Sequence, residues 1–366
     1  MLSFLILLTL NFAEAKTKTL APDAVTKVID QYAQLVTGTY KVTLEKTEEL
    51  ESEIKKFLKN PSSENLEKSK AAWIVARKFY SKTEAYRFYG GPIDADQTGP
   101  EGFINSWPVD ESYIDYVKGD AQAGIINQKE KFPKIEAKLL RSLNTKDGEA
   151  NIATGFHAIE FLLWGQDLNA KGPGNRSFED YIESKNANAE RRQTYLKVVT
   201  KMLVEDLENV LTPWENGSFV KELKKETNGA AIQRIMTGLT TLSFDEMSGE
   251  RMTVAFAKKD QENEQDCFSD NSLKDLAANQ EGILEVFEQT GLKDLFSETK
   301  QTAKISSLLK SNLETLQSIQ ATFDVIVLNP KHAERKKIQK LILSLQTQAR
   351  LMDKLGENYG LELNVQ

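Results

Sequence analysis

The chain has 366 residues and a formal net charge of −7, and 40% of its residues are hydrophobic. This length suits one large domain or two medium ones, with a substantial core. The acidic balance and the lack of a basic stripe argue against nucleic acid as a partner. A single cysteine, Cys267, excludes an internal disulfide.

The first fifteen residues have the pattern of a secretory signal peptide. A short apolar run, Leu2 to Leu10, precedes a small-x-small cleavage pattern at Ala13-Glu14-Ala15. The run is too short to span a bilayer, and no cysteine follows it for attachment of a lipid. We therefore expect residues 1–15 to be removed. The mature chain is expected to have no transmembrane segment and to reside in the periplasm or cell envelope.

Two long helices are predicted in the first hundred residues. The first runs from Pro22 to Lys59 with an expected break near Gly38, and the second follows a Pro-containing turn and extends to about Tyr89. In the second helix, Glu84 and Arg87 lie three residues apart and therefore share a face. The aromatic residues around them favour a partly buried ion pair over a solvated one.

A segment rich in Pro, Gly, Asp and Asn follows, from Ile93 to Val109. Loops of this length inside compact domains are usually either functional or disordered. Because Phe103 and Trp107 can pack onto a core, we expect this one to be ordered. Asp110 comes directly after it, and either caps the short helix that follows or lines a site.

The stretch from Asn151 to Asp167, NIATGFHAIEFLLWGQD, is the most informative in the chain. Its helical pattern ends near Trp164 and is apolar nearly all round, which is typical of a buried helix. His157 and Glu160 lie three residues apart on one face of it. A buried carboxylate needs a charge partner, hydrogen bonds or a metal. Gly155 lies beside Glu160 on the helical wheel and leaves room for another backbone or a ligand.

The second half is also predicted to be helical. Helical patterns cover residues 190–211 and 230–258, and a further helix is expected to start at Asn329-Pro330. A turn-rich stretch, Ala170 to Asn175, is the candidate boundary between the halves. No long run of β-branched residues alternates with polar ones, so the sequence predicts an all-α protein.

A weak internal similarity links the two halves. In each, a long helix with Glu and Arg runs into a polar loop that ends in an aromatic residue and an aspartate. These endings are Trp107-Pro108-Val109-Asp110 and Phe268-Ser269-Asp270. The similarity predicts two helical-bundle lobes, residues 20–185 and 186–366, related as a pseudo-repeat with the site at their interface.

Three separated motifs resemble those of the imelysin-like family. GFHAIEFLLWGQD resembles its G-x-H-x-x-E signature, and the others are TEAYRFYGGPID with NSWPVD, and ENEQDCFSDNS. In the third motif the family more often has a His before the Ser/Cys-Phe-Ser-Asp stretch, where this chain has Gln265 and Asp266. The resemblance covers most of the mature chain and implies one imelysin-like domain of a cell-envelope protein. The family is historically filed with the metallopeptidases and is often linked to iron uptake.

Three functional hypotheses remain open at this point. The first, which the resemblance favours, is an exported protein that binds a metal or small ligand and acts in iron uptake, with envelope iron-transport proteins as partners. The second is a metallopeptidase that uses His157 and Glu160, although no H-E-x-x-H motif and no general base can be assigned. The third is a helical scaffold in which this His–Glu pair is structural. The sequence alone does not establish an enzymatic activity.

For the first hypothesis, His157 and Glu160 are the expected metal ligands. One imidazole among carboxylates suits iron, manganese or calcium, so the expected cofactor is a divalent or ferric ion of unassigned identity. The histidine would bind as neutral imidazole, so binding should weaken below about pH 6.5. Other residues are expected to line the ligand site as oxygen donors, an anion clamp and aromatic walls. They are Glu84, Arg87, Trp107, Asp110, Trp164, Ser269 and Asp270.

Overall fold

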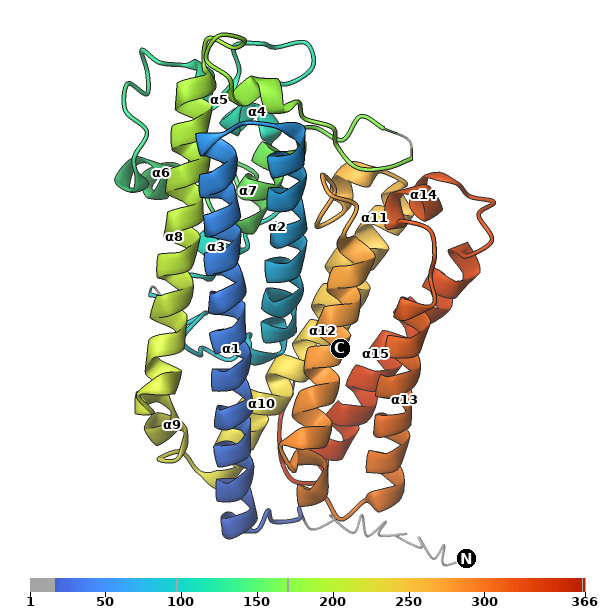
Figure 1. The fold of residues 1–366 in the computed structure, drawn as a ribbon. Helices are drawn as coiled ribbons and strands as arrows, with labels where there is room; N and C mark the ends of the chain where they lie inside the picture. The colour runs from blue at the N-terminus through green and yellow to red at the C-terminus, as the bar shows by residue number, and fades with distance from the viewer. Residues whose placement is uncertain (1–16, 97, 170, 364, 366) are drawn as a thin grey trace, which may run out of the picture.

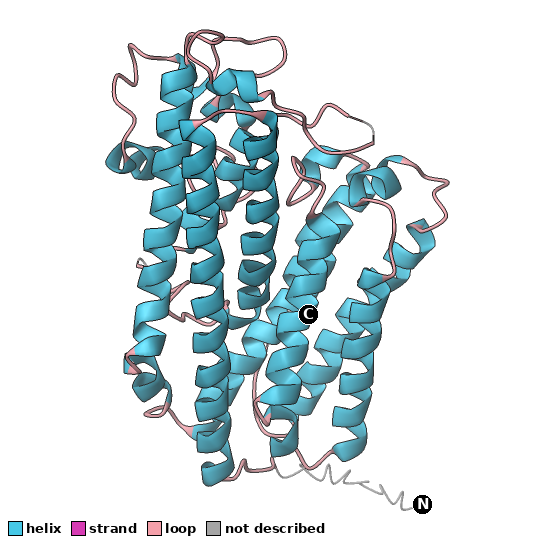
Figure 2. Ribbon diagram, viewed as in Figure 1, coloured by secondary structure: helices cyan, strands magenta, loops and turns pink. Residues whose placement is uncertain are grey.

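The computed structural model describes residues 17–96, 98–169, 171–363 and 365. Helices make up 67% of the structure, and the described residues contain no strand, only an isolated bridge between Val117 and Asp120. The all-α prediction is therefore confirmed (Figures 1 and 2). The expected signal peptide lies outside the described residues. Within them, no helix combines the length and apolar character that crossing a bilayer requires.

Three long helices stand side by side in the first part of the chain. Helix α1 (Pro22–Lys59) packs along both α2 (Ser63–Thr83) and α8 (Ala189–Glu215), and the short α7 (Gly155–Trp164) packs against α2 and α8 (Figure 1). Helix α1 is continuous through Gly38, so the expected break there was wrong. One glycine costs a helix interior only about 1 kcal/mol, which the buried stripe of a 38-residue helix outweighs.

Short helical elements connect these long helices. The segment between α2 and α7 begins with a turn of 3-10 helix and holds four short α-helices, one of which lies within the loop predicted from Ile93 to Val109. These elements are η1 (Glu84–Tyr86), α3 (Glu101–Ile104), α4 (Glu111–Ile114), α5 (Gly124–Asn127) and α6 (Ala137–Leu143). Between α7 and α8 lies η2 (Phe178–Tyr181).

A second group of long helices follows α8 and the short α9 (Ser218–Leu223). In this group α12 packs on α13, α13 packs on α15, and α15 packs on both α10 and η3. The group consists of α10 (Asn228–Thr241), the π-helix η3 (Leu242–Val254), α11 (Ala255–Lys258), α12 (Ser272–Gln289), α13 (Thr299–Gln317) and α15 (Arg335–Glu357). The smaller η4 (Gln261–Asn263), η5 (Leu292–Leu295) and α14 (Phe323–Leu328) connect them.

Two helices predicted from the sequence fall in this second group, and their observed bounds can be compared with the predicted ones. The helix expected over 230–258 is present as the continuous run of α10, η3 and α11, with a π-helix in its middle. Helix α15 begins at Arg335, so the expected start at Asn329-Pro330 was wrong. Asn329 instead follows α14, and its side chain accepts a hydrogen bond from the Lys331 amide, which closes a local turn.

The two groups meet where α2 packs against α12. At Gly282 of α12, a Cβ atom would lie 2.3 Å from the Lys82 carbonyl oxygen, so only glycine allows this approach. The division into residues 20–185 and 186–366, and the relation of the halves as a pseudo-repeat, stay predictions.

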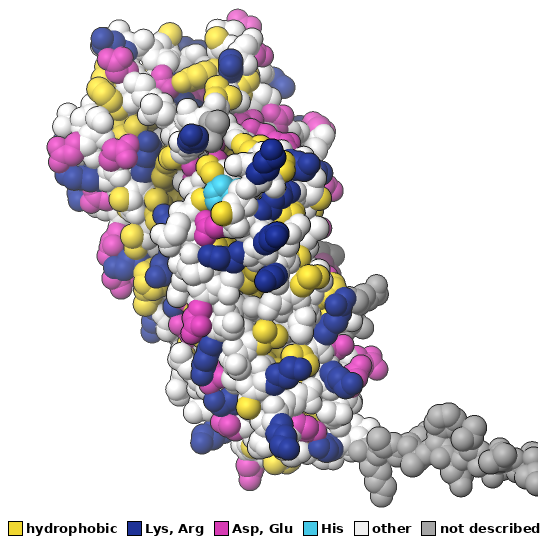
Figure 3. Space-filling view, turned by 90° about the vertical axis from the view of Figure 1, so that its right-hand side faces the viewer, with side chains coloured by type: hydrophobic (Ala, Val, Ile, Leu, Met, Phe, Trp, Pro, Cys, Tyr) yellow, Lys and Arg dark blue, Asp and Glu magenta, His cyan; other side chains and the backbone are white. Residues whose placement is uncertain are grey.

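The surface charge is unevenly distributed over the molecule. Lys and Arg side chains gather on the face that α13 and α15 present (Figure 3). Exposed lysines on these helices include Lys300, Lys304, Lys310, Lys336, Lys340 and Lys354. Because the whole chain carries −7, acidic groups must predominate elsewhere.

Candidate metal site

Helix α7 is held in place by close contacts of its backbone. Gly155, its first residue, has φ = +85°, and a Cβ atom there would lie 2.4 Å from the carbonyl oxygen of Ile104. The space expected beside Glu160 is therefore filled by another stretch of backbone. Near the other end, the Tyr181 hydroxyl donates to the carbonyl oxygen of Leu162 at 2.6 Å. Such partners satisfy carbonyls that have none within the helix.

His157 and Glu160 lie in contact on this helix, and Asp266 joins them from the segment before α12. The Nδ1 atom of His157 lies 3.0 Å from Oε2 of Glu160 and 3.6 Å from Oδ1 of Asp266. All three side chains are fully buried, with 0% exposed. One potential ligand atom from each lies within 4.8 Å of the others, and no other such group of three occurs among the described residues.

The hydrogen bonds of this triad are unequally satisfied. Oε1 of Glu160 accepts two bonds from Ser269, one from its amide at 2.9 Å and one from its hydroxyl at 2.7 Å. In contrast, no nitrogen or hydroxyl group donates to either oxygen of Asp266, which shares a hydrogen bond with the Asp275 carboxyl, and Nε2 of His157 has no partner. Buried polar atoms without partners are rare in proteins, and a bound ion is one explanation for them.

One buried arginine reaches the triad from α2. Nε of Arg77 donates to Oδ2 of Asp275 at 2.5 Å and lies 3.3 Å from Oδ1 of Asp266. Its Nη1 donates to the side-chain oxygen of Asn105. A single guanidinium charge is thus divided between two carboxylates, so it leaves the acidic charge around Asp266 only partly balanced.

A second buried cluster surrounds Glu84. Both of its oxygens accept from Nη1 of Arg87 at 3.0 Å, one also accepts from Arg251, and the other accepts from the Asn105 amide at 3.2 Å. The expected buried Glu84–Arg87 pair is therefore present. Burial alone would raise the pKa of Glu84, but Arg87 and Arg251 outweigh it and lower the pKa to about 2. Asn105 links this cluster to Arg77.

In the triad, burial outweighs the nearby positive charge, so the pKa of its glutamate rises instead of falling. Burial raises the pKa of Glu160 to about 8, although Ser269 and Arg77 oppose the shift, and burial also raises the pKa of Asp266. Burial, together with Arg77 and Arg251, lowers the pKa of His157 well below its usual value. The imidazole is therefore neutral near pH 7, and the expected weakening of metal binding below about pH 6.5 stays a prediction.

This donor set fits a metal ion. A neutral imidazole can ligate through Nδ1, and the two carboxylates supply oxygens that little positive charge compensates. Mixed nitrogen and oxygen donors suit zinc, manganese and iron. A cation would replace the proton that Glu160 otherwise carries at neutral pH, since metal ligands bind in their deprotonated form.

Trp107 and Trp164, the two tryptophans predicted to line the ligand site, contact the segments that carry the triad. Nε1 of Trp107 donates to the carbonyl oxygen of Glu264 at 2.7 Å, which holds the segment that carries Asp266. Trp164, the last residue of α7, packs edge-on against Trp73 with ring centroids 5.4 Å apart. Both therefore fix the elements that supply the triad.

The two predicted aspartates are in different environments. Asp110 caps α4, because its Oδ1 accepts from the amide of Ser112 at 3.0 Å, which is the simpler of its two expected roles. Asp270 lies beyond Ser269 in a left-handed conformation, with φ = +55°. Burial raises its pKa to about 7, Asp324 and Asp167 add to the shift, Lys274 opposes it, and no residue of the triad contributes.

Sequence reasoning missed Asp266, Arg77 and Arg251. A signal existed for Asp266, because Gln265 and Asp266 lie in the region where the family more often has a histidine, and an aspartate can itself bind a metal. For Arg77, the signal was its place on the apolar stripe of α2, where it is 1% exposed. Nothing in the sequence around Arg251 indicated that it contacts Glu84, since the two come from distant helices.

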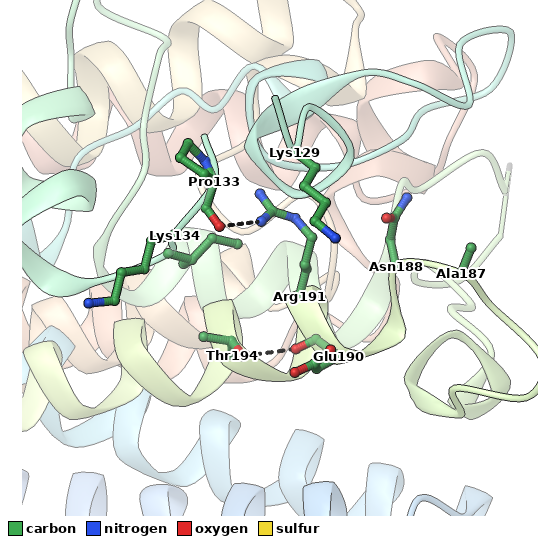
Figure 4. A pocket seen from close by; sticks show the side chains of 9 residues that line it. Lys129, Pro133, Lys134, Ala187, Asn188, Glu190, Arg191 and Thr194 are labelled. Atoms are coloured by element: carbon green, nitrogen blue, oxygen red, sulfur yellow. Dashed lines mark hydrogen bonds between the residues drawn. The ribbon is translucent and has the colours of Figure 1, made fainter. Parts of the chain in front are cut away.

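Five surface hollows lined by described residues include no side chain of the triad. One of about 460 Å³ lies between α8 and the loop before α6, and Figure 4 shows the side chains that line it. Its guanidinium, that of Arg191, donates to the backbone oxygens of Ile126 at 2.6 Å and Phe132 at 2.7 Å. This group is therefore engaged by the fold rather than free to bind a ligand.

The fold and the site define an all-helical protein with a closed imidazole–carboxylate centre on a buried helix. The model of one protein family, imelysin (peptidase M75), matches residues 36–352 of the chain. The chain therefore belongs to the imelysin family.

Individual relatives agree with this assignment. The chain is 24% identical over 266 residues to iron-regulated protein A of Synechococcus elongatus, a match that covers 69% of this chain and 61% of that protein. It thus spans less than two thirds of that relative's length.

Two solved structures share the fold. One is a protein assigned as an iron-regulated protein A precursor from Parabacteroides distasonis, with a TM-score of 0.71 and 15% identity over 94% of this chain and 97% of that one. The other is an imelysin-like protein from Psychrobacter arcticum, with a TM-score of 0.70 and 13% identity over 95% of this chain and 99% of that one.

Proposed function

We propose that this chain is a metal-binding imelysin of the cell envelope that acts in iron acquisition. The observation that carries the proposal is the triad of His157, Glu160 and Asp266, whose ligand atoms lie within 4.8 Å of one another in a fully buried site. The name of the Synechococcus relative, iron-regulated protein A, supports the link to iron. The apolar run and cleavage pattern in residues 1–15 support export.

In this proposal each residue of the site has a defined role. His157, Glu160 and Asp266 hold the ion, which supplies the positive charge that the surrounding residues do not. Ser269 fixes the orientation of Glu160 through two hydrogen bonds. Arg77 holds the Asp266 segment and limits the total negative charge, and residues that orient metal ligands in this way commonly tune affinity.

The metallopeptidase hypothesis has less support from this geometry. A peptidase needs a general base and an open coordination position besides its ligands. Glu84 and Asp275, which the hydrogen-bond network connects to the triad, are both bound to arginines. The ligand side chains are also closed to solvent, which leaves a polypeptide substrate no route to them without a movement of the fold.

Metal binding can be tested on chelator-treated mature protein. Calorimetric titrations with Fe²⁺ (without oxygen), Mn²⁺ and Zn²⁺ should show one site in the wild type. Asp266→Asn and Glu160→Gln should weaken it at least about tenfold, the scale reported for residues at metal sites. Glu48→Gln, an exposed change on α1, is the matched control and should bind as the wild type does. Equal affinities in all four proteins would contradict the proposal.

The alternatives give different outcomes in the same series. A metallopeptidase would show chelator-sensitive proteolysis that is lost in Glu160→Gln. A structural His–Glu pair would show a stability loss in His157→Ala without any effect on metal binding.

Export and the link to iron need cellular tests. Amino-terminal sequencing of protein from the envelope fraction should give a start at or near Lys16, and recovery of intact Met1 in the cytoplasm would contradict export. Deletion of the gene should slow growth only when iron is limiting. Expression of the wild-type protein in the deletion strain should restore growth, and expression of Asp266→Asn should not.

A further inference from the structure

A second group of carboxylates lies where the chain after α7 meets η4 and α14. It consists of Asp167, Glu264, Asp270 and Asp324, which we call the acidic cluster. The segments that carry it are tied together: the side-chain amide of Gln261 donates to the Asp167 backbone oxygen at 2.7 Å and to its Oδ2 at 3.3 Å. Helix α14, which holds Asp324, packs against η4.

Several oxygens of the acidic cluster are buried without partners. Asp324 is 1% exposed, and neither of its carboxylate oxygens accepts a hydrogen bond. Both carboxylate oxygens of Asp270 and Oε1 of Glu264 are also buried and unpaired. Burying a carboxylate without hydrogen-bond partners is costly. Three side chains of the acidic cluster have such unpaired oxygens.

The charges around the acidic cluster do not balance it. After burial, Asp324 contributes most to the raised pKa of Asp270, which reaches about 7, and Asp167 adds to it. Lys274 alone opposes that shift. Burial and Asp324 also raise the pKa of Asp167 to about 6, against the hydrogen bond from Asn169. Among the described residues, no arginine opposes these two shifts as Arg77 and Arg251 oppose burial in the neighbouring clusters.

We propose that the acidic cluster binds a hard divalent cation, Ca²⁺ in preference to Mg²⁺. Its side chains offer oxygen atoms only, which Ca²⁺ and Mg²⁺ favour over zinc or iron. Ca²⁺ accepts six to eight oxygens in irregular arrangements and takes backbone carbonyls and waters as well, whereas Mg²⁺ requires a near-octahedral shell. No three of these carboxylates place their oxygens within 4.8 Å of one another among the described residues, so two of them, with backbone carbonyls and waters, would form the Ca²⁺ shell.

Such an ion would support the proposed metal site from a neighbouring position. Glu264 and Asp270 bracket the segment that provides Asp266 and Ser269 to the triad. An ion bound by Asp270 and Asp324 would therefore fix the far end of that segment against α14. The inference does not depend on the proposed function, because the two sites share no residue.

Calorimetric titration of Ca²⁺ into the chelator-treated mature protein tests the inference. The wild type should bind one Ca²⁺, and Asp324→Asn and Asp270→Asn should each weaken binding at least about tenfold, because a charged ligand is lost. Asp294→Asn removes one exposed aspartate from η5 in the same half of the chain and should bind as the wild type does. His157→Ala should also bind as the wild type does, which separates this site from the triad.

Thermal unfolding shows whether a variant has lost the ion or only its fold. Ca²⁺ should raise the unfolding temperature of the wild type, since it binds the folded state alone. In Asp324→Asn the ion-free protein should unfold at the wild-type temperature or above, because like-charge repulsion is relieved, and the rise with Ca²⁺ should be lost. No Ca²⁺ binding by the wild type, wild-type affinity in Asp324→Asn, or loss of binding in His157→Ala would each overturn the inference.

Discussion

The two buried clusters shift the pKa of their glutamate in opposite directions. Around Glu84 the fold supplies two arginines, and the pKa of the carboxyl falls to about 2. Around Glu160 the fold supplies a neutral imidazole, a second carboxylate and a share of one arginine, and the pKa rises to about 8. Both side chains are buried to within 1% of completely, so burial alone does not separate them.

This difference in charge compensation distinguishes a structural cluster from one whose charge is suited to a bound cation. A carboxylate whose charge the fold has neutralised contributes to stability and has no need of an external ion. A group whose acidic charge is left uncompensated costs stability until a cation arrives. The Glu84 cluster is therefore satisfied by the fold itself, and the triad is the group that supports the proposed metal binding.

The largest effect should come from removing the arginine that touches the triad. Arg77→Met leaves Asp266 and Asp275 buried without their counter-charge, and breaking a buried pair in this way costs about 3–5 kcal/mol. Urea unfolding at neutral pH measures the change. Lys82→Met, on the same helix but in a partly exposed pair with Glu285, should cost less than about 1 kcal/mol. Equal losses of unfolding free energy in the two variants would show that the buried pairs of Arg77 contribute no more than an exposed pair.

A slightly smaller effect is expected at Glu84. The difference between a folded pKa of about 2 and the ordinary 4.5 corresponds to roughly 3 kcal/mol, which Glu84→Gln should lose at pH 7. Because the folded pKa is lowered, this contribution is complete above pH 4.5 and disappears as the pH falls toward 2. The difference between wild type and Glu84→Gln in urea unfolding should therefore shrink between pH 5 and 3.

Glu160→Gln should behave differently in the metal-free protein. Because the folded pKa of Glu160 is raised, its ionisation penalises folding increasingly as the pH rises from 4.5 to about 8. The amide removes that penalty but loses part of the bonding to Ser269 and His157. We therefore expect Glu160→Gln to gain stability relative to the wild type as the pH rises from about 5 to 8, the opposite of the loss in Glu84→Gln. A loss as large as that of Glu84→Gln would show that the two clusters have the same role.

The last effect concerns metal affinity and amounts to about tenfold per pH unit below the pKa of Glu160. The ion must displace the proton of Glu160, so binding of Zn²⁺ should strengthen as the pH rises from 6 to 8 and level off above about 8. An apparent midpoint near 6.5 would instead assign the titration to His157. Calorimetry in buffers of different ionisation enthalpy should show proton release in the same range, and a pH-independent affinity would contradict the assignment.

The sequence predicted features that depend on neighbouring residues in the chain. The buried helix, the facing of His157 and Glu160, and the backbone contact at Gly155 all follow from helical periodicity and from the lack of a side chain. The capping role of Asp110 and the pair of Glu84 with Arg87 were likewise predictable, because the partners lie within three residues of each other.

The remaining site residues depend on contacts between distant segments. Asp266 and Ser269 reach Glu160 only because the segment before α12 folds over α7, and Arg251 meets Glu84 only through the packing of η3. The sequence could name Ser269 and Asp270 as a motif. It could not separate Ser269, which binds Glu160, from Asp270, whose electrostatic neighbours are Asp324 and Asp167.

The most direct test of the distinction between the two clusters is a crystal structure with Zn²⁺, recorded at the zinc absorption edge. We predict one anomalous peak about 2.0–2.2 Å from Nδ1 of His157 and from carboxylate oxygens of Glu160 and Asp266, with no peak at Glu84. An empty triad in crystals grown at saturating Zn²⁺, or an ion held by Glu84 instead, would contradict the assignment of the triad to metal binding.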